Sequence, residues 1–177
     1  MNIPNTLSLF RLFLVPAFLL VFFSGMPYSY AAATGIFLLS GLTDVLDGYL
    51  ARKYGQITVL GRVLDPLADK LMVMSVLTAM SLSDMIPLVI AILYVVKETL
   101  QILGSVLLLR YIKDMPPSNI WGKTATVLFY AAITVSMMID LSRAAEYALF
   151  APAFIAVSAA MASYVSVGVR LLKEISK

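Results

Sequence analysis

Long apolar stretches separated by short polar breaks run along the whole chain, and this pattern predicts six helices. The breaks carry Gly, Pro, Ser or Asn, residues that interrupt helices. Several stretches approach 20 apolar residues, the length of a helix that crosses the hydrocarbon core of a bilayer. The pattern therefore predicts an all-α integral membrane protein, a six-transmembrane-helix bundle with helices at about 7–23, 30–54, 62–82, 85–111, 120–139 and 147–172.

Composition agrees with a membrane-embedded chain. Hydrophobic residues make up 61% of the sequence and charged residues only 13%, whereas a soluble domain is about one quarter charged. The 177 residues fit one ordinary domain. We therefore expect a single membrane domain over residues 1–177.

The distribution of basic residues predicts the orientation of the helices. With a cytoplasmic N-terminus, only Arg143 among the basic residues placed at helix ends would lie on the outer side. Positive charge concentrates on the cytoplasmic side of membrane proteins, so we expect a multi-pass protein of the cell membrane with both termini in the cytoplasm. The inner side would receive Arg11, Arg52, Lys53, Arg62, Lys70, Arg110, Lys113, Lys123, Arg170, Lys173 and Lys177.

Two absences narrow the chemistry that the chain can perform. It contains no cysteine and no histidine, which excludes thiolate nucleophiles, His-ligated zinc and Ser-His-Asp triads. A net charge of +3 is not the strongly basic footprint of a nucleic-acid-binding protein, so we expect membrane lipids and no nucleic acid as partners. An enzyme built from this chain must work with carboxylates, hydroxyls, lysines and arginines.

Four of the ten acidic residues fall in one short segment. Asp44 and Asp47 are three residues apart near the end of the second predicted helix, and Asp65 and Asp69 are four apart at the start of the third. Each pair therefore lies on one helix face. If the two helices are antiparallel, four carboxylates converge near the inner membrane surface.

Such a cluster requires positive charge, because two like charges about 4 Å apart repel by about 4 kcal/mol even at an effective dielectric constant of 20. Hard oxygen ligands in this number suit Mg²⁺ or Mn²⁺, and such an ion also neutralises a leaving phosphate. The alternative is that these aspartates lie at the membrane interface and pair with local basic residues. This alternative is less favoured, because carboxylates within a membrane are costly and usually functional, and here four of them lie on two helices. The basic residues near in sequence are Arg52, Lys53, Arg62 and Lys70.

The same segment carries the pattern Asp-x2-Asp-Gly-x2-Ala-Arg-x8-Gly-x3-Asp-x3-Asp, which resembles the signature of the CDP-alcohol phosphatidyltransferases. The six-helix layout and the opening residues 4–11 are also similar to that family. The likeness covers most of the chain. The eight fixed positions are Asp44, Asp47, Gly48, Ala51, Arg52, Gly61, Asp65 and Asp69.

This resemblance implies a membrane homodimer that uses two divalent ions, Mg²⁺ or Mn²⁺. It implies that Asp44, Asp47, Asp65 and Asp69 hold the metal. Asp69 would also be the catalytic base that takes the proton from the acceptor hydroxyl, which then attacks the lipid-side phosphorus of CDP-diacylglycerol and releases CMP. The residues implied in CDP binding are Asn5, Asp47, Gly48, Ala51, Arg52 and Gly61.

The resemblance further implies glycerol 3-phosphate as the acceptor, with phosphatidylglycerophosphate as the product and Lys97, Arg110 and Lys123 as the residues that bind its phosphate. The chain departs from the related synthases, which usually show Arg-Glu where Lys97-Glu98 stands and a second Arg where Ser105 stands. The spacing of Lys97, Arg110 and Pro116-Pro117 is also compatible with cardiolipin synthases, whose acceptor is phosphatidylglycerol. A buried Lys97–Glu98 ion pair and ordinary flanking charge at Arg110 and Lys123 are the non-functional alternatives.

A transporter and a non-catalytic scaffold are the two alternatives to an enzyme. A metal-ion or organic-ion transporter would use the four aspartates as a transport site, but it needs a polar path from both sides of the membrane. The outer half of each predicted helix carries almost no polar residue. A non-catalytic scaffold leaves the aspartate pattern unexplained. Metal-dependent binding of CMP or CDP-lipid separates the enzyme from both.

Overall fold

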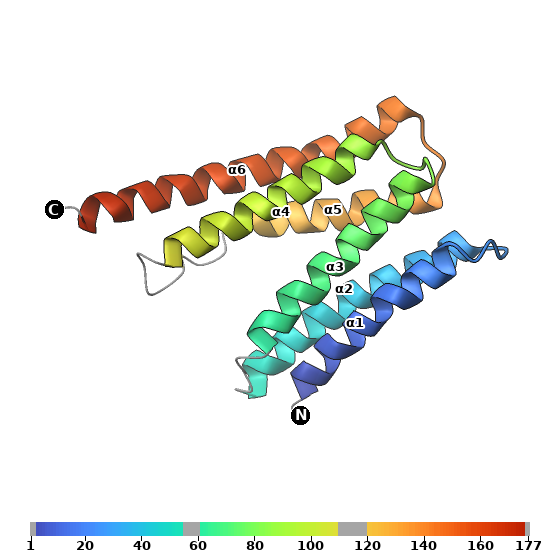
Figure 1. Ribbon diagram of the computed structural model, residues 1–177, viewed down its shortest axis with the longest axis horizontal. Helices are drawn as coiled ribbons and strands as arrows, with labels where there is room; N and C mark the ends of the chain where they lie inside the picture. Colours follow the sequence, from blue (N-terminus) through green and yellow to red (C-terminus); the bar gives the residue numbers. More distant parts are fainter. Residues whose placement is uncertain (1–2, 55–60, 110–119, 176–177) are drawn as a thin grey trace. The chain divides into compact units, whose positions relative to one another are not determined.

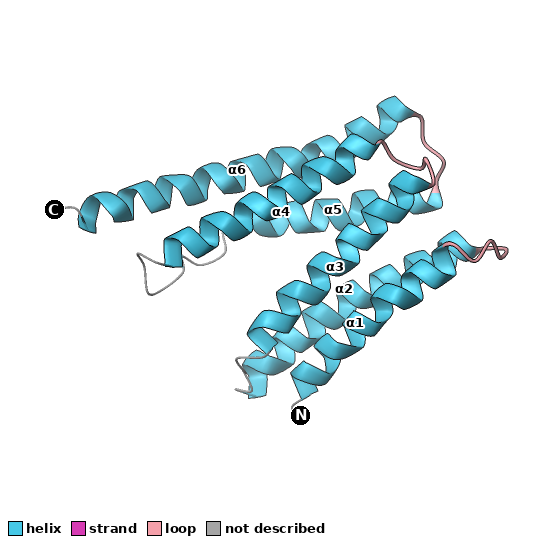
Figure 2. Ribbon diagram, in the orientation of Figure 1, coloured by secondary structure: helices cyan, strands magenta, loops and turns pink. Residues whose placement is uncertain are grey.

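Helices are the regular secondary structure of the part of the chain that the structure describes. The computed structural model describes residues 3–54, 61–109 and 120–175, which form six helices with short turns between some of them and no strand (Figures 1 and 2). The helices are α1 (Ile3–Phe22), α2 (Ser29–Tyr54), α3 (Gly61–Leu82), α4 (Leu88–Leu109), α5 (Ile120–Met138) and α6 (Arg143–Ile175). The predicted all-α class is confirmed, and each predicted helix has a counterpart within a few residues.

Two of the connections depend on unusual backbone angles. Gly25 has a φ of 64° between α1 and α2, and the neighbouring Tyr28 has the same value. Asp84 has a φ of 56° between α3 and α4. Only glycine adopts this left-handed region at no steric cost, and aspartate tolerates it better than most residues. These turns end helices at the positions where the apolar pattern breaks.

Three helices in the described part of the chain are long and apolar enough to cross a membrane. They are Ser29–Tyr49 in α2, Ile120–Met138 in α5 and Arg143–Ser163 in α6. A shorter apolar helix covers Thr6–Phe22 in α1. These lengths and compositions are those of a membrane protein with several apolar helices.

The helices group into two compact units. The first comprises Met1–Ile86 and Thr134–Asp140, and the second comprises Pro87–Ile133 and Leu141–Lys177. In the first unit, α1 packs against both α2 and α3 (Figure 1). In the second, α4 packs against α6, and the ring of Phe129 on α5 contacts the rings of Tyr94 on α4 and Phe154 on α6.

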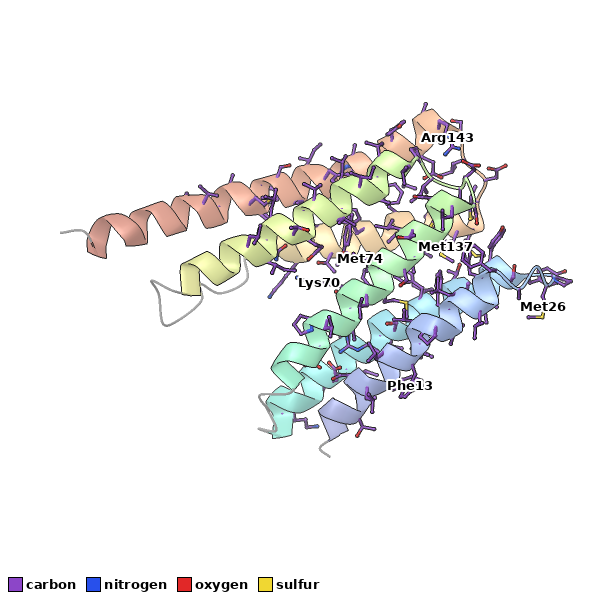
Figure 3. The ribbon with its side chains drawn as sticks, viewed as in Figure 1. Phe13, Met26, Lys70, Met74, Met137 and Arg143 are labelled. Atoms are coloured by element: carbon purple, nitrogen blue, oxygen red, sulfur yellow. The ribbon has the colours of Figure 1, made fainter. Side chains whose placement is uncertain are left out.

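Helix α1 has a buried face that carries a charged residue and an exposed face that is apolar. Arg11 and Phe18 on the buried face are both 0% exposed, whereas Phe13 and Leu20 are 66% and 75% exposed (Figure 3). Lipid chains are as apolar as leucine, so an exposed apolar face is stable in a bilayer. A charge on the same helix is stable only when it faces the bundle interior and finds a partner there.

Candidate functional site

Three helices of the first unit bring acidic side chains together around one cation. Asp44 and Asp47 lie on α2, Asp65 lies on α3, and all three surround Arg11 of α1. Asp47 is almost fully buried, with a side chain that is 2% exposed. The side chains of Asp44 and Asp65 are 43% and 34% exposed. The expected convergence of carboxylates from the second and third helices is therefore present for these three.

The guanidinium of Arg11 makes the contacts that join the three helices. Its Nη1 donates to Oδ1 of Asp44, and its Nη2 donates to Oδ2 of Asp47 over 2.5 Å. The same Nη2 lies 3.8 Å from Oδ1 of Asp65. Hydrogen bonds between charged groups are about twice as strong as neutral ones. Arg11 therefore fixes one oxygen of Asp44 and one of Asp47.

A serine one turn before Arg11 fixes the third carboxylate. The hydroxyl of Ser8, which is 1% exposed, donates to Oδ1 of Asp65. Ser8 and Arg11 are three residues apart, so both face α2 and α3 from the same side of α1. Helix α1 thus supplies two of the groups that position the aspartates.

Sequence reasoning did not assign Ser8 and Arg11 to the site. Arg11 was expected among the basic residues of the inner membrane rim, and the compensating charge was sought at Arg52, Lys53, Arg62 and Lys70. The signal in the sequence was the single charge inside the apolar run of residues 7–23. A charge in that setting needs a buried partner, and Ser8 shares its helix face.

The four basic residues that are close to the aspartates in sequence lie in different environments. Lys53 is exposed, and its Nζ lies 5.7 Å from the ring centroid of Tyr49. Lys70 is half-buried on α3, next to Asp69 (Figure 3). The side chains of Arg52 and Arg62 lie outside the described residues. The positive charge that the structure places among the three carboxylates is that of Arg11.

The charge and donor types of this cluster fit a divalent ion. Asp44, Asp47 and Asp65 with Arg11 have a formal net charge of −2, and carboxylate oxygens are the ligands that Mg²⁺ and Mn²⁺ prefer. Within the residues that the structure describes, no three acidic side chains are already arranged as a metal site. A bound metal would therefore share these oxygens with the guanidinium or take its place.

The remaining residues predicted to belong to this site are only partly described. Asp69 lies one helical turn after Asp65 and is half-buried, and Gly48 follows Asp47 and is also half-buried. The predicted CDP-binding residues Asn5, Ala51, Arg52 and Gly61 are all in helices, but their side chains fall outside the described residues. Their roles stay predictions.

The second unit contains a separate cavity of about 250 Å³ with two lysines in its wall. Lys97 comes from α4 and Lys123 from α5, so the structure brings together two of the three residues predicted to bind the acceptor phosphate. The third, Arg110, lies outside the described residues. The cavity is lined by Lys97, Gln101, Gly122, Lys123, Ala125, Thr126, Val157, Ala160 and Met161.

Lys97 has two roles in this unit. Its Nζ donates to Oε1 of Glu98 and lies 5.2 Å from the ring centroid of Tyr94. Glu98 is 6% exposed and Lys97 is half-buried, so the ion pair that was the alternative interpretation of these residues is present, with its acidic partner buried. The lysine also lines the cavity, and pairing with Glu98 does not remove it from contact with a ligand there.

Comparison with known proteins decides the family. A family model described as CDP-alcohol phosphatidyltransferase matches residues 1–166. The chain belongs to the CDP-alcohol phosphatidyltransferase family. The match includes the aspartate cluster of the first unit and both lysines of the cavity.

Similar proteins of this family carry two different names. A cardiolipin synthase (CMP-forming) of Streptomyces coelicolor is 36% identical over 143 residues, 79% of this chain and 66% of that protein. A CDP-diacylglycerol–glycerol-3-phosphate 3-phosphatidyltransferase of Rickettsia bellii is 31% identical over 163 residues, 88% of this chain and 90% of that protein.

Shorter matches reach higher identity. An enzyme of Pseudomonas fluorescens with the same name as the Rickettsia protein is 51% identical over 73 residues, 41% of this chain. The aligned part of this chain spans 66% of the length of the Streptomyces protein in one comparison and 37% of the length of the Pseudomonas protein in the other. The comparisons therefore fix the family, and the names of these relatives divide between the two enzymes.

We expect Ser8→Ala to destabilise the chain by about 1.5–3 kcal/mol, the range for a hydrogen bond to a charged group. Thermal unfolding of the purified protein in detergent measures this change. Ser158→Ala is the matched control, because among the described residues its exposed hydroxyl donates only to the carbonyl of Phe154 in its own helix, a contact that adds little stability. Equal unfolding temperatures for both variants would contradict a positioning role for Ser8.

Proposed function

We propose that this chain transfers a phosphatidyl group from CDP-diacylglycerol to glycerol 3-phosphate, forming phosphatidylglycerophosphate and releasing CMP. The observation that carries the proposal is the complete eight-position aspartate pattern, whose Asp44, Asp47 and Asp65 meet around one cation. The Rickettsia relative, named for this reaction, aligns with 88% of the chain.

In this reaction the acceptor hydroxyl oxygen bonds to the lipid-side phosphorus, and the bond from that phosphorus to the CMP oxygen breaks. The hydroxyl proton passes to the carboxylate of Asp69, the proposed general base. A carboxylate suits this role because the chain has no histidine. The CMP phosphate takes the electron pair of the broken bond and leaves as an anion.

Asp44, Asp47, Asp65 and Asp69 would hold two divalent ions, Mg²⁺ or Mn²⁺, which when bound neutralise the diphosphate and polarise the attacked phosphorus. The residual charge of −2 around Arg11 balances one of these ions, which supports a metal at the cluster. We also propose that the cytidine diphosphate group binds along the two helix segments of the pattern, at Asn5, Asp47, Gly48, Ala51, Arg52 and Gly61.

The cavity of the second unit supports a phosphate-bearing acceptor. Lys97 and Lys123 both line it, and ammonium groups bind phosphate as point charges. We propose that these two lysines, with Arg110, bind the phosphate of glycerol 3-phosphate. A volume of about 250 Å³ suits this small acceptor.

A cardiolipin synthase that uses phosphatidylglycerol as the acceptor is the second candidate. It is favoured by the 36% identity to the Streptomyces protein of that name and by Lys97, which replaces the arginine usual in phosphatidylglycerophosphate synthases. Both candidate enzymes share the donor and the aspartate cluster, so they differ only in which acceptor binds beside Lys97 and Lys123.

The setting of this activity follows from the helices. We propose that all six span the cell membrane, with both termini and the active site on the cytoplasmic side, and that the protein is a homodimer. The three long apolar helices and the inward bias of basic residues support the spanning layout. An ion transporter would use the same aspartates without any nucleotide, which makes nucleotide chemistry the deciding observation.

Purified protein in detergent, given CDP-diacylglycerol, glycerol 3-phosphate and Mg²⁺ or Mn²⁺, should release CMP. We expect Asp69→Asn to lower the rate by a factor of about 100 or more, because general base catalysis contributes 10²–10⁴-fold. Asp84→Asn is the control: it is the same chemical change at an exposed position, and asparagine also tolerates the positive φ found there.

Release with phosphatidylglycerol alone would replace the proposed acceptor and make the chain a cardiolipin synthase. No CMP with either acceptor, together with no metal-dependent binding of CDP-lipid, would contradict the transferase and favour the transporter.

Lys123→Gln should raise the KM for glycerol 3-phosphate about tenfold and leave the KM for CDP-diacylglycerol nearly unchanged, because a hydrogen bond to a charged group contributes about 1.5 kcal/mol. Lys123 is the better position to test, since Lys97 also pairs with Glu98. Arg143→Gln removes an exposed positive charge from the first turn of α6 (Figure 3) and is the control. An unchanged KM for glycerol 3-phosphate in Lys123→Gln would place the acceptor phosphate elsewhere.

A further inference from the structure

Arg11 is the most deeply buried charge near the aspartates, yet the proposed reaction gives it no task. The residue is 0% exposed on the inner face of α1. Its two terminal nitrogens bind Asp44 and Asp47, whereas its Nε is buried and finds no hydrogen-bond partner within the described residues. Burying a guanidinium costs free energy unless the group is paired with opposite charge and hydrogen-bonded.

The carboxylates do need it, because burial weakens the screening that water would provide. Asp47 is 2% exposed and lies on the same helix face as Asp44. Without Arg11, Asp44, Asp47 and Asp65 would have a formal charge of −3 in one place, and their mutual repulsion would separate α2 from α3. Arg11 removes one unit of this charge, and a divalent ion would be needed for the other two.

Arg11 uses only part of each carboxylate. It contacts Oδ1 of Asp44 and Oδ2 of Asp47, so a metal ion held by the same aspartates would compete with the guanidinium for their negative charge. Two cations that share the same anions also repel each other. The guanidinium must therefore lower the affinity of the cluster for a metal.

We propose that Arg11 is the resident counter-ion of the aspartate cluster: it holds Asp44 and Asp47 in place when no metal is bound and moderates the affinity of the cluster for a divalent ion. This role rests on the proposed metal site and makes Arg11 a positioning residue. It also explains why a charge is placed in the apolar first helix. The chain can fold before the metal and CDP-lipid arrive, and a moderate affinity leaves the metal exchangeable.

The test compares the unmodified chain with Arg11→Gln, Arg11→Lys and the control Arg143→Gln, all purified in detergent. Thermal unfolding is followed by circular dichroism in EDTA and in Mn²⁺, and Mn²⁺ binding is measured from the electron paramagnetic resonance signal of the free ion. In Arg11→Gln we expect a lower unfolding temperature in EDTA, a larger rise on adding Mn²⁺ than in the unmodified chain, and a Kd for Mn²⁺ that is at least about tenfold lower.

Arg11→Lys keeps the charge without the planar fork, so its unfolding temperature and Kd should lie between those of the unmodified chain and Arg11→Gln. If Arg11→Gln does not fold, the double variant Arg11→Gln with Asp47→Asn restores the charge balance. This double variant should fold, and its unfolding temperature should lie close to that of the unmodified chain. A double variant that is no better folded than Arg11→Gln would overturn the counter-ion role.

A Kd for Mn²⁺ that is unchanged or higher in Arg11→Gln would also overturn the proposal while leaving the metal site intact. Absence of Mn²⁺ binding in both the unmodified chain and Arg11→Gln would instead contradict the metal site of the proposed function. In that case the unfolding temperatures in EDTA and the double variant still decide whether Arg11 is the counter-ion.

Discussion

The compensation of buried negative charge is the constraint on which this structure depends. Carboxylates from α2 and α3 lie together in a chain that is 61% hydrophobic, and they are stable there because the guanidinium of Arg11 reaches them from α1. The packing of α1 against both helices brings the cation to the anions. Removing one partner of a buried ion pair typically costs 3–5 kcal/mol, so the chemistry of the site and the packing of the first unit are inseparable.

The helices were predictable because apolar runs and their breaks are local properties of the sequence. The ends of α2 and α3 lie within one residue of the predicted 30–54 and 62–82. Helix α6 starts earlier than predicted, at Arg143, because its first turn contains the charged residues Arg143 and Glu146 and the continuous apolar pattern begins only later. The helical spacing of Asp44 and Asp47 likewise predicted their shared face.

The partners of the aspartates were not predictable in the same way, because they depend on packing between helices distant in sequence. Ser8 lies 57 residues from Asp65, and Arg11 lies 33 residues from Asp44. A basic residue near the membrane surface satisfies the positive-inside pattern whether or not it has a partner. Lys97 is a related case: its pairing with Glu98 is compatible with ligand binding, and the structure shows the lysine both paired and lining the cavity.

We propose that Asp44, Asp47, Asp65 and Asp69 form the metal-dependent reaction centre of a phosphatidyltransferase. Anomalous X-ray scattering at the manganese edge, from crystals grown with Mn²⁺ and CDP-diacylglycerol, tests this most directly. The account predicts manganese peaks within about 2–2.6 Å of these carboxylate oxygens, the range for hard cations with oxygen ligands, and the lipid diphosphate beside them. Manganese peaks elsewhere, with Arg11 still bound to Asp44 and Asp47 and no diphosphate nearby, would contradict it.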